Sequence, residues 1–151
     1  MLGSETSTYE ILKGLEQSLL RNIKYEFHLF GEKNNISSKL IKFSKLKNAS
    51  EIIDCSDSIS MNDKPSDIIK SKSSSSMNLA IKSVEDNKSD AVLSFGNTGA
   101  LMTLSLLNIK TLSEIKRPSI ASIWPNLKGE SIVLDLGANT KLSSRYLIDN
   151  A

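Results

Sequence analysis

A strand-to-helix turn rich in small residues constrains the fold of this chain more than any other feature. Ala91–Leu93 is a short apolar run typical of a buried strand, and Leu101–Leu107 is typical of a buried helix. The segment Ser94–Gly99 joins them. The first N–H groups of such a helix have no partner within the helix, and together with the helix dipole they favour an anion, most often a phosphate.

Two interpretations fit this turn. As an anion site, Gly96 and Gly99 would let the backbone approach the anion, while Asn97 and Thr98 would add side-chain donors. As a purely structural feature, a tight turn in which Asn97 or Thr98 caps the helix needs no ligand. The turn alone does not decide between them.

Strand-like and helix-like segments alternate along the whole chain. This alternation predicts an α/β fold with a mostly parallel sheet and helices on both faces, in a single domain. The expected helices cover residues 9–19, 36–46, 77–84, 101–107 and 143–150, and the expected strands cover 25–30, 51–54, 91–93, 119–124 and 132–134.

Ligands of open α/β sheets bind beyond the carboxyl ends of the strands. The segments Ser94–Asn97 and Asp135–Asn139 both fall there, so we expect them to form two walls of one crevice. Asp135 at its strand tip would be a polar anchor or proton acceptor, or would cap the next turn. Asn139 would donate to phosphate or to a carbonyl group, or would hold a left-handed turn.

The length, composition and charge of the chain argue against several classes of protein. A chain of 151 residues with 39% hydrophobic and 24% charged residues is typical of one soluble globular domain. The formal charge of +2, with lysines and acids interleaved, argues against nucleic acid as a partner. No run approaches the roughly 20 apolar residues of a membrane helix. Cys55 is the only cysteine and His28 the only histidine, which argues against a metal site or a Cys–His nucleophile and favours a cytoplasmic location.

Three further blocks follow the same order and approximate spacing as blocks of a known family. They are Asn62-Asp63-Lys64-Pro65-Ser66, Ser75-Ser76-Met77 and Asp135-Leu136-Gly137-Ala138-Asn139. With the turn at 94–102, they resemble the phosphate acyltransferases of bacterial phospholipid synthesis, which make acyl phosphate from acyl-acyl-carrier-protein and inorganic phosphate. The resemblance covers nearly the whole chain and implies a three-layer sandwich like that of isocitrate and isopropylmalate dehydrogenases, here truncated.

The resemblance also implies roles for individual residues. The expected catalytic residues are Asn97, Asp135 and Asn139, and the expected substrate- and phosphate-binding residues are Lys64, Ser75, Ser76, Ser94, Gly96, Thr98, Gly99 and Gly137. Taken alone, Lys64 fits a solvated surface lysine better than a phosphate ligand, and helix capping would explain Ser75 and Ser76 nearly as well as a binding role. No organic cofactor and no metal are expected.

The implied reaction needs no nucleophile on the enzyme, because phosphate can attack the thioester itself. The protein then has to hold phosphate near the carbonyl and stabilise the developing oxyanion. Backbone amides, asparagines, a threonine and a lysine suit that task.

The chain departs from the family pattern in three places. Residues 2–8 stand where the family has a glycine-rich loop preceded by a strand, Lys141 replaces an aspartate, and the chain stops at Ala151 where the family continues for about as long again. We therefore interpret it as the N-terminal part of such an enzyme. The missing half would complete the sheet and carry the family's homodimer contacts and a peripheral membrane association.

Two alternatives remain. A truncated or degenerate remnant would bind phosphate or a partner chain without turnover. Another α/β enzyme, such as a phosphate acetyltransferase or a decarboxylating dehydrogenase, would explain the turn but not the Asp-Lys-Pro-Ser and Ser-Ser-Met blocks.

Overall fold

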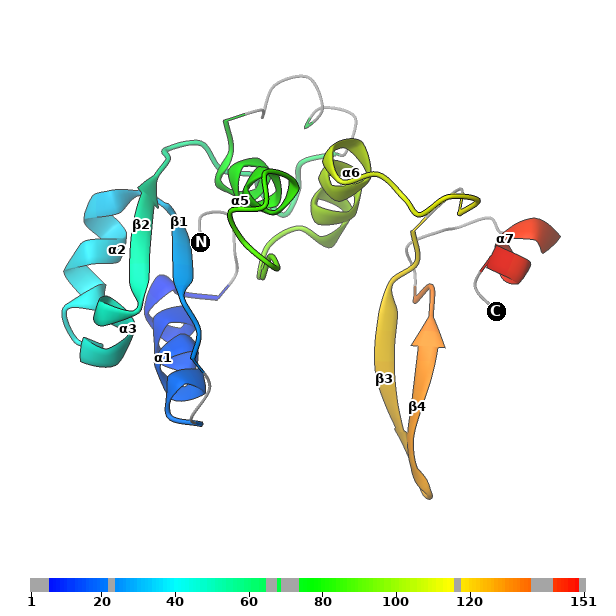
Figure 1. Cartoon of the computed structure of the whole chain (residues 1–151), viewed down its shortest axis with the longest axis horizontal. Coiled ribbons are helices and arrows are strands. Elements are labelled where there is room, and N and C mark those ends of the chain that lie inside the picture. The colour runs from blue at the N-terminus through cyan, green and yellow to red at the C-terminus, as the bar shows by residue number, and fades with distance from the viewer. Residues whose placement is uncertain are drawn as a thin grey trace. The chain divides into compact units, whose positions relative to one another are not determined.

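The computed structural model describes residues 6–21, 24–64, 68, 74–115, 118–136 and 143–149. The chain forms two compact units, Met1–Ile109 and Lys110–Ala151, drawn in Figure 1. The predicted α/β class, with a parallel pair of strands and helices, is confirmed. The prediction that both units belong to one domain stays a prediction.

The first unit begins with helices packed on two parallel strands. Its elements are α1 (Thr8–Leu19), β1 (Phe27–Gly31), α2 (Lys33–Leu40), α3 (Ser44–Asn48) and β2 (Ser50–Asp54). In the β1–β2 pair, Phe27 lies opposite Ser50 and Gly31 opposite Asp54. The helices bring their apolar residues together with Leu29 of β1 in one core, where Leu12 and Leu46 are completely buried. The predicted helix at 9–19 and the predicted strands at 25–30 and 51–54 are confirmed.

The single helix predicted over 36–46 is wrong, because the structure divides this region into α2 and α3. The break between them turns Phe43 into the core while Ile41 stays 71% exposed. Phe43 cannot cap the new helix with its side chain. Glu16 of α1 does so instead, since its carboxylate accepts a hydrogen bond of 2.6 Å from the N–H of Leu46.

A second core lies between α5 (Ser76–Glu85) and α6 (Thr98–Asn108). Ile81 and Ala100 are completely buried there. Both helices were predicted, but the expectation that α6 is buried holds for only one of its faces. Ala100 and Leu104 face the core, whereas Leu107 is 52% exposed.

The predicted strand at Ala91–Leu93 is wrong, although the segment keeps the exposure pattern of a strand. Residues 91–95 are alternately exposed and half-buried, yet they form no ladder with another described strand. Val92 packs against the second core, while Leu93 on the opposite side is 68% exposed. A strand exists only through hydrogen bonds to a neighbour, and an apolar run does not provide the neighbour.

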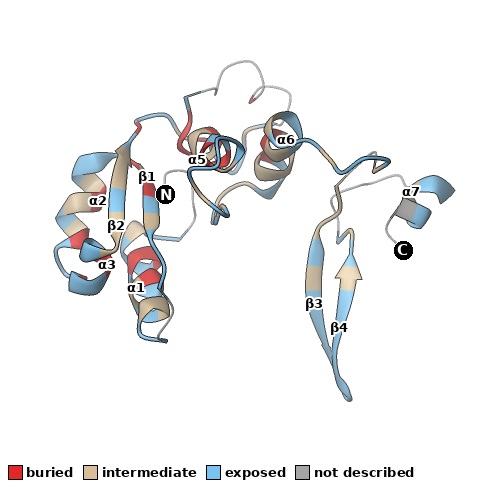
Figure 2. Cartoon of the chain, viewed as in Figure 1, coloured by how far each residue is buried: buried red, intermediate tan, exposed pale blue. Residues whose placement is uncertain are grey.

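The second unit contains a β-hairpin and a short helix. The hairpin strands β3 (Ala121–Asn126) and β4 (Gly129–Leu134) pair in antiparallel fashion, and α7 covers Ser144–Asp149. The predicted strands at 119–124 and 132–134 and the predicted helix at 143–150 are confirmed with shifted ends. Figure 2 shows that most of the hairpin is exposed. Ile123 and Ile132, which lie opposite each other in the two strands, are 64% and 77% exposed.

Cys55 directly follows β2 and is buried. Burial raises the pKa of its thiol above the ordinary value. A thiol that stays neutral in the folded chain stabilises it below the unfolded pKa of about 8.5, and this contribution is lost as the pH rises toward the folded pKa. We expect urea unfolding between pH 8 and 10 to show stability falling with a slope of up to about 1.4 kcal/mol per pH unit from this group. Cys55→Ala should remove that part of the slope, and equal slopes for the two proteins would contradict the assignment.

Candidate functional site

Residues 55–64 connect the beginnings of α5 and α6. The N–H of Ser76 donates to the carbonyl of Asp57 over 3.0 Å. The side-chain amide of Asn97 donates to the carbonyls of Ser60, Met61 and Asp63 over 3.2, 3.1 and 3.1 Å. The structure thus attaches the Ser75–Ser76 block and the turn before α6 to the segment that carries Lys64.

Asn97 is the N-cap of α6 and uses both ends of its amide. Its oxygen accepts a hydrogen bond of 3.0 Å from the N–H of Ala100, while its nitrogen holds the three carbonyls. The N–H groups of Thr98 and Gly99, by contrast, donate to no described residue. Because the Asn97 amide is occupied, the donors that remain for an anion at this turn are the backbone N–H groups and the Thr98 hydroxyl, and the geometry favours a positioning role for Asn97.

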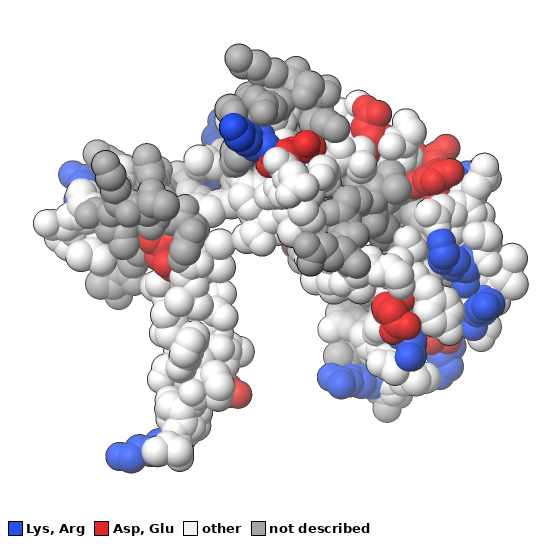
Figure 3. Space-filling model, turned by 180° about the vertical axis from the view of Figure 1, so that it is seen from behind, with Lys and Arg blue, Asp and Glu red and all other residues white. Residues whose placement is uncertain are grey.

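Lys64 follows Asp63, whose carbonyl accepts from Asn97, and it is exposed. Lys64 therefore directly follows one of the residues whose carbonyls hold Asn97, the N-cap of α6. On the face shown in Figure 3, lysines and acids are interspersed over the described residues. The features of this turn that suit a phosphate are Lys64 and the N–H groups of the first turn of α6.

The backbone conformation of the turn does not require its glycines, and Ser94 makes one hydrogen bond within it. Among the described glycines only Gly31 and Gly129 have positive φ. The backbone conformation at Gly96 and Gly99 is therefore one that other residue types can also adopt. Gly99 lies exposed in the first turn of α6. The hydroxyl of Ser94 accepts a hydrogen bond of 3.2 Å from the N–H of Gly96. The φ of Gly99 is not positive, so backbone conformation alone does not require glycine at this position.

Ser75 and Ser76 are buried at the beginning of α5. The hydroxyl of Ser75 caps the helix by accepting from the N–H of Asn78 over 3.3 Å. We expect Ser75→Ala to lower the free energy of unfolding by about 1 kcal/mol. Ser7→Ala is a matched control, because Ser7 caps α1 in the same way. If Ser75 serves only as a cap, both variants bind phosphate as the parent does in a phosphate titration, whereas weaker binding by Ser75→Ala alone would assign it a ligand contact.

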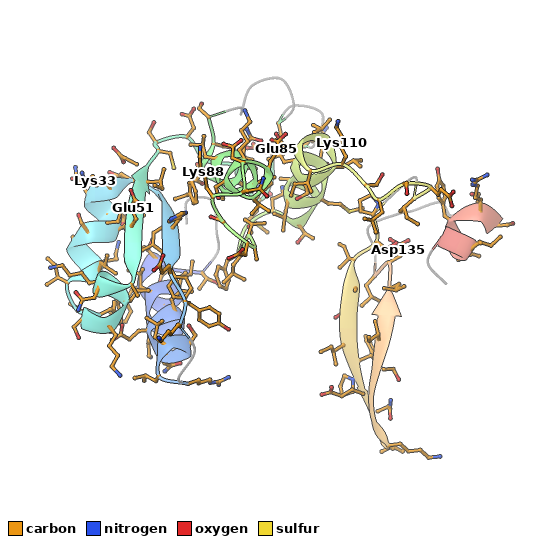
Figure 4. The ribbon with its side chains drawn as sticks, in the orientation of Figure 1. Lys33, Glu51, Glu85, Lys88, Lys110 and Asp135 are labelled. Atoms are coloured by element: carbon orange, nitrogen blue, oxygen red, sulfur yellow. The ribbon has the colours of Figure 1, made fainter. Side chains whose placement is uncertain are left out.

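Asp135 lies in the second unit, at the end of β4 (Figure 4). Its backbone is left-handed, with φ of 59°, and its N–H donates to the carbonyl of Ile120 over 2.8 Å. Aspartate tolerates this conformation better than most residues do. Gly137 and Asn139 lie outside the described residues, as do Pro65 and Ser66. The crevice shared by Asn97 and Asn139 therefore stays a prediction.

The contribution of Asp57 was not predicted. Its carbonyl binds the N–H of Ser76 and its carboxylate accepts from the hydroxyl of Ser74, so it fixes the start of α5 at two points. Asp57 lies 17 residues before Ser74 in the sequence, so no local pattern of residue types indicates this contact. In the part of the chain that the structure describes, no three His, Cys, Asp or Glu residues are grouped to hold a metal ion. No helix in that part has the length and apolarity needed to cross a membrane.

These features define an α/β protein with a glycine-containing turn, capped by Asn97, at the start of a helix. The whole chain, residues 1–151, matches the family described as "Fatty acid synthesis protein", and the chain belongs to that family. It is 38% identical over 152 residues to a protein named "Phosphate acyltransferase" from Sinorhizobium fredii. Proteins of the same name from Rhizobium meliloti and Pelagibacter ubique are each 39% identical, over 152 and 149 residues.

The aligned region includes nearly all of this chain but only part of each relative. It covers 100% of this chain in the two rhizobial comparisons and 98% in the third, but 44% of each relative. The chain therefore spans less than half the length of these relatives.

Proposed function

We propose that the protein to which these residues belong is a phosphate acyltransferase, which moves an acyl group from acyl-acyl-carrier-protein to inorganic phosphate in phospholipid synthesis. The observation that carries the proposal is the similarity, over the full length of this chain, to relatives that bear this name. The turn before α6 agrees with it, because Thr98 and Gly99 offer N–H donors beside the segment that carries Lys64.

In this proposal the phosphate lies at the first turn of α6, held by those N–H groups, the Thr98 hydroxyl and Lys64. A phosphate oxygen attacks the thioester carbonyl, the carbon–sulfur bond breaks, and the thiolate of the carrier protein leaves. Asn97 positions the helix end, while Asp135, Gly137 and Asn139 contribute the second wall. Ser75, Ser76, Ser94 and Gly96 shape the loops around the substrate. The protein contributes placement and electrostatic stabilisation rather than a covalent intermediate.

The finer architecture belongs to the same proposal. We place the parallel pair and its helices in a three-layer sandwich of the isocitrate-dehydrogenase type, completed by further polypeptide. The full-length protein would be a cytoplasmic homodimer that meets membranes peripherally. The absence of a second cysteine in this chain agrees with a reducing compartment.

The activity is tested directly on full-length protein. Incubation with palmitoyl-acyl-carrier-protein and phosphate should release free carrier protein and form acyl phosphate, which hydroxylamine traps as a hydroxamate. Omitting phosphate is the control for simple thioester hydrolysis. Release of carrier protein at the same rate without phosphate, and without hydroxamate, would refute the proposal.

The phosphate site is tested on the 151-residue chain. Gly99→Val places a branched side chain over the first turn of α6, and we expect it to weaken phosphate binding about tenfold or more, because the anion can no longer approach the N–H groups. Gly14→Val is the matched control, since it makes the same change in a helix at a position with open space around it. Amide shifts in a phosphate titration measure both. Equal affinities for the two variants would place the anion elsewhere.

The short span relative to the relatives keeps one alternative open: the chain by itself binds phosphate without turnover. Phosphate binding by the 151 residues, together with activity only in the full-length protein, is the result that this alternative predicts.

A further inference from the structure

The turn between α2 and α3 carries several lysines in a stretch of chain without acids. Residues 33–49 contain five lysines and no aspartate or glutamate. Four of the five lie around the turn, from the last turn of α2 to the end of α3. They form the lysine cluster, which consists of Lys39, Lys42, Lys45 and Lys47. All but the half-buried Lys39 are exposed.

The acids of the neighbouring helix α1 do not neutralise this cluster. Glu10 forms its ion pair within α1, with Lys13 at 3.7 Å. The carboxylate of Glu16 accepts hydrogen bonds from the backbone N–H groups of Leu46 and Lys45, over 2.6 and 3.4 Å, at the start of α3. Among the residues that the structure describes, none of the four lysines forms an ion pair. Their charge is therefore available to a partner.

The cluster surrounds an exposed apolar side chain and is supported by the first core. Ile41 is 71% exposed at the turn. The ammonium group of the adjacent Lys42 lies 5.6 Å from the centroid of the Tyr9 ring, which attracts it. The Tyr9 ring in turn lies 5.3 Å from that of Phe43, whose side chain is buried in the core. An apolar anchor within a charged rim is typical of a protein interface.

The packing of α2 and α3 favours a protein partner over a lipid surface. A helix that lies in a membrane interface places its apolar face among the acyl chains. Here the apolar residues of both helices are already buried in the first core, as Ile36, Leu40 and Leu46 show. The cluster offers lysines and one isoleucine instead, and an acidic protein surface is their electrostatic complement.

We propose that the lysine cluster and Ile41 form the docking surface for an acidic face of the acyl carrier protein. The inference rests on the proposed function, in which the carrier is the only protein substrate. The carrier holds the acyl group on a long prosthetic arm, so its docking surface can lie apart from the phosphate site. Opposite charges on the two proteins speed their association and set the orientation in which they meet.

The probe is fluorescein-labelled acyl carrier protein without an acyl group, and fluorescence anisotropy measures its binding to the 151-residue chain. We expect the double variant Lys42→Glu/Lys47→Glu to weaken binding about tenfold or more, because it reverses two charges. Added salt should weaken binding by the parent chain. Ile41→Ser should also weaken binding, since it removes the apolar anchor from an exposed position where stability does not depend on it.

Lys82→Glu/Lys128→Glu is the matched control. It makes the same change in net charge at exposed positions outside the cluster, and Lys82, like Lys47, lies in the last turn of a helix. We expect this variant to bind the carrier as the parent does, and circular dichroism should show both double variants folded. Equal affinities of the two double variants would overturn the proposal. Failure of the carrier to bind, together with binding to phosphatidylglycerol vesicles that only the cluster variant loses, would assign the cluster to a lipid surface instead.

Kinetics of the full-length protein separate this inference from the proposed function. The cluster variant should raise the KM for the acyl-carrier substrate and leave kcat unchanged, because docking lies outside the chemical step. If the parent forms acyl phosphate but both double variants keep its KM, the docking surface is refuted and the proposed function stands. If the parent forms no acyl phosphate while carrier binding still depends on the cluster, the docking surface stands and the proposed reaction is refuted.

Discussion

Replacing Asn97 with aspartate is expected to lower the free energy of unfolding of the chain by about 2–3 kcal/mol. Aspartate has nearly the same shape and is as good an N-cap as asparagine, so the bond to the N–H of Ala100 persists. The other end of the side chain changes from a donor to an oxygen that faces the carbonyls of Ser60, Met61 and Asp63. Three favourable contacts become repulsive, and urea unfolding followed by circular dichroism measures the cost.

Two further variants separate the causes. Asn97→Ser keeps a neutral cap and loses only the amide donors, so we expect an intermediate loss of about 1–2 kcal/mol. Asn62→Asp adds a charge to the same exposed segment without removing a side-chain donor to any described residue, and should change stability by less than about 0.5 kcal/mol. Equal stability of Asn97→Asp and the parent protein would show that the three carbonyls do not depend on Asn97.

Asn97→Asp is also expected to change the affinity for phosphate. A carboxylate at the N-cap puts a negative charge beside the N–H groups of Thr98 and Gly99, so phosphate binding should weaken along with stability. Asn97→Ser, which is neutral, should weaken phosphate binding less than Asn97→Asp does. This difference distinguishes an electrostatic effect on the anion from loss of the helix position.

Local features of this site could be predicted from the sequence. The glycine-containing turn, the cap at Asn97 and the helix after it depend on residues close together in the chain, and short-range hydrogen bonds decide them. The cap at Ser75 belongs to the same class. Residue type and spacing predicted the helix after the turn and offered both caps as one of two interpretations.

Contacts between distant segments could not be predicted in the same way. Asn97 is held by the backbone carbonyls of Ser60, Met61 and Asp63. Every residue has a backbone carbonyl, so no pattern of side chains predicts which ones Asn97 contacts. The division of 36–46 depends on Phe43 turning into a core built by other helices. The strand expected at 91–93 needs a neighbour that apolar character does not specify. In each case the deciding partner lies far away in the sequence.

Removal of the Ile81 side chain beyond Cβ is expected to destabilise the chain by about 3 kcal/mol. Ile81 in α5 is completely buried in the second core, together with Ala100 in the first turns of α6. A cavity at Ile81→Ala would loosen the packing that fixes this end of α6, so we also expect weaker phosphate binding under conditions where the variant is still folded. Urea unfolding and a phosphate titration followed by amide shifts give the two quantities separately.

Leu12→Ala is the matched control for this effect. Leu12 is equally buried, but it belongs to the first core with α2, α3 and β1, and its loss should cost a similar free energy of unfolding. Because the first core does not include α6, phosphate affinity should remain that of the parent protein. A comparable loss of phosphate binding in Leu12→Ala would mean that the turn depends on the stability of the whole first unit, whereas a loss confined to Ile81→Ala places the anion site on the packing between α5 and α6.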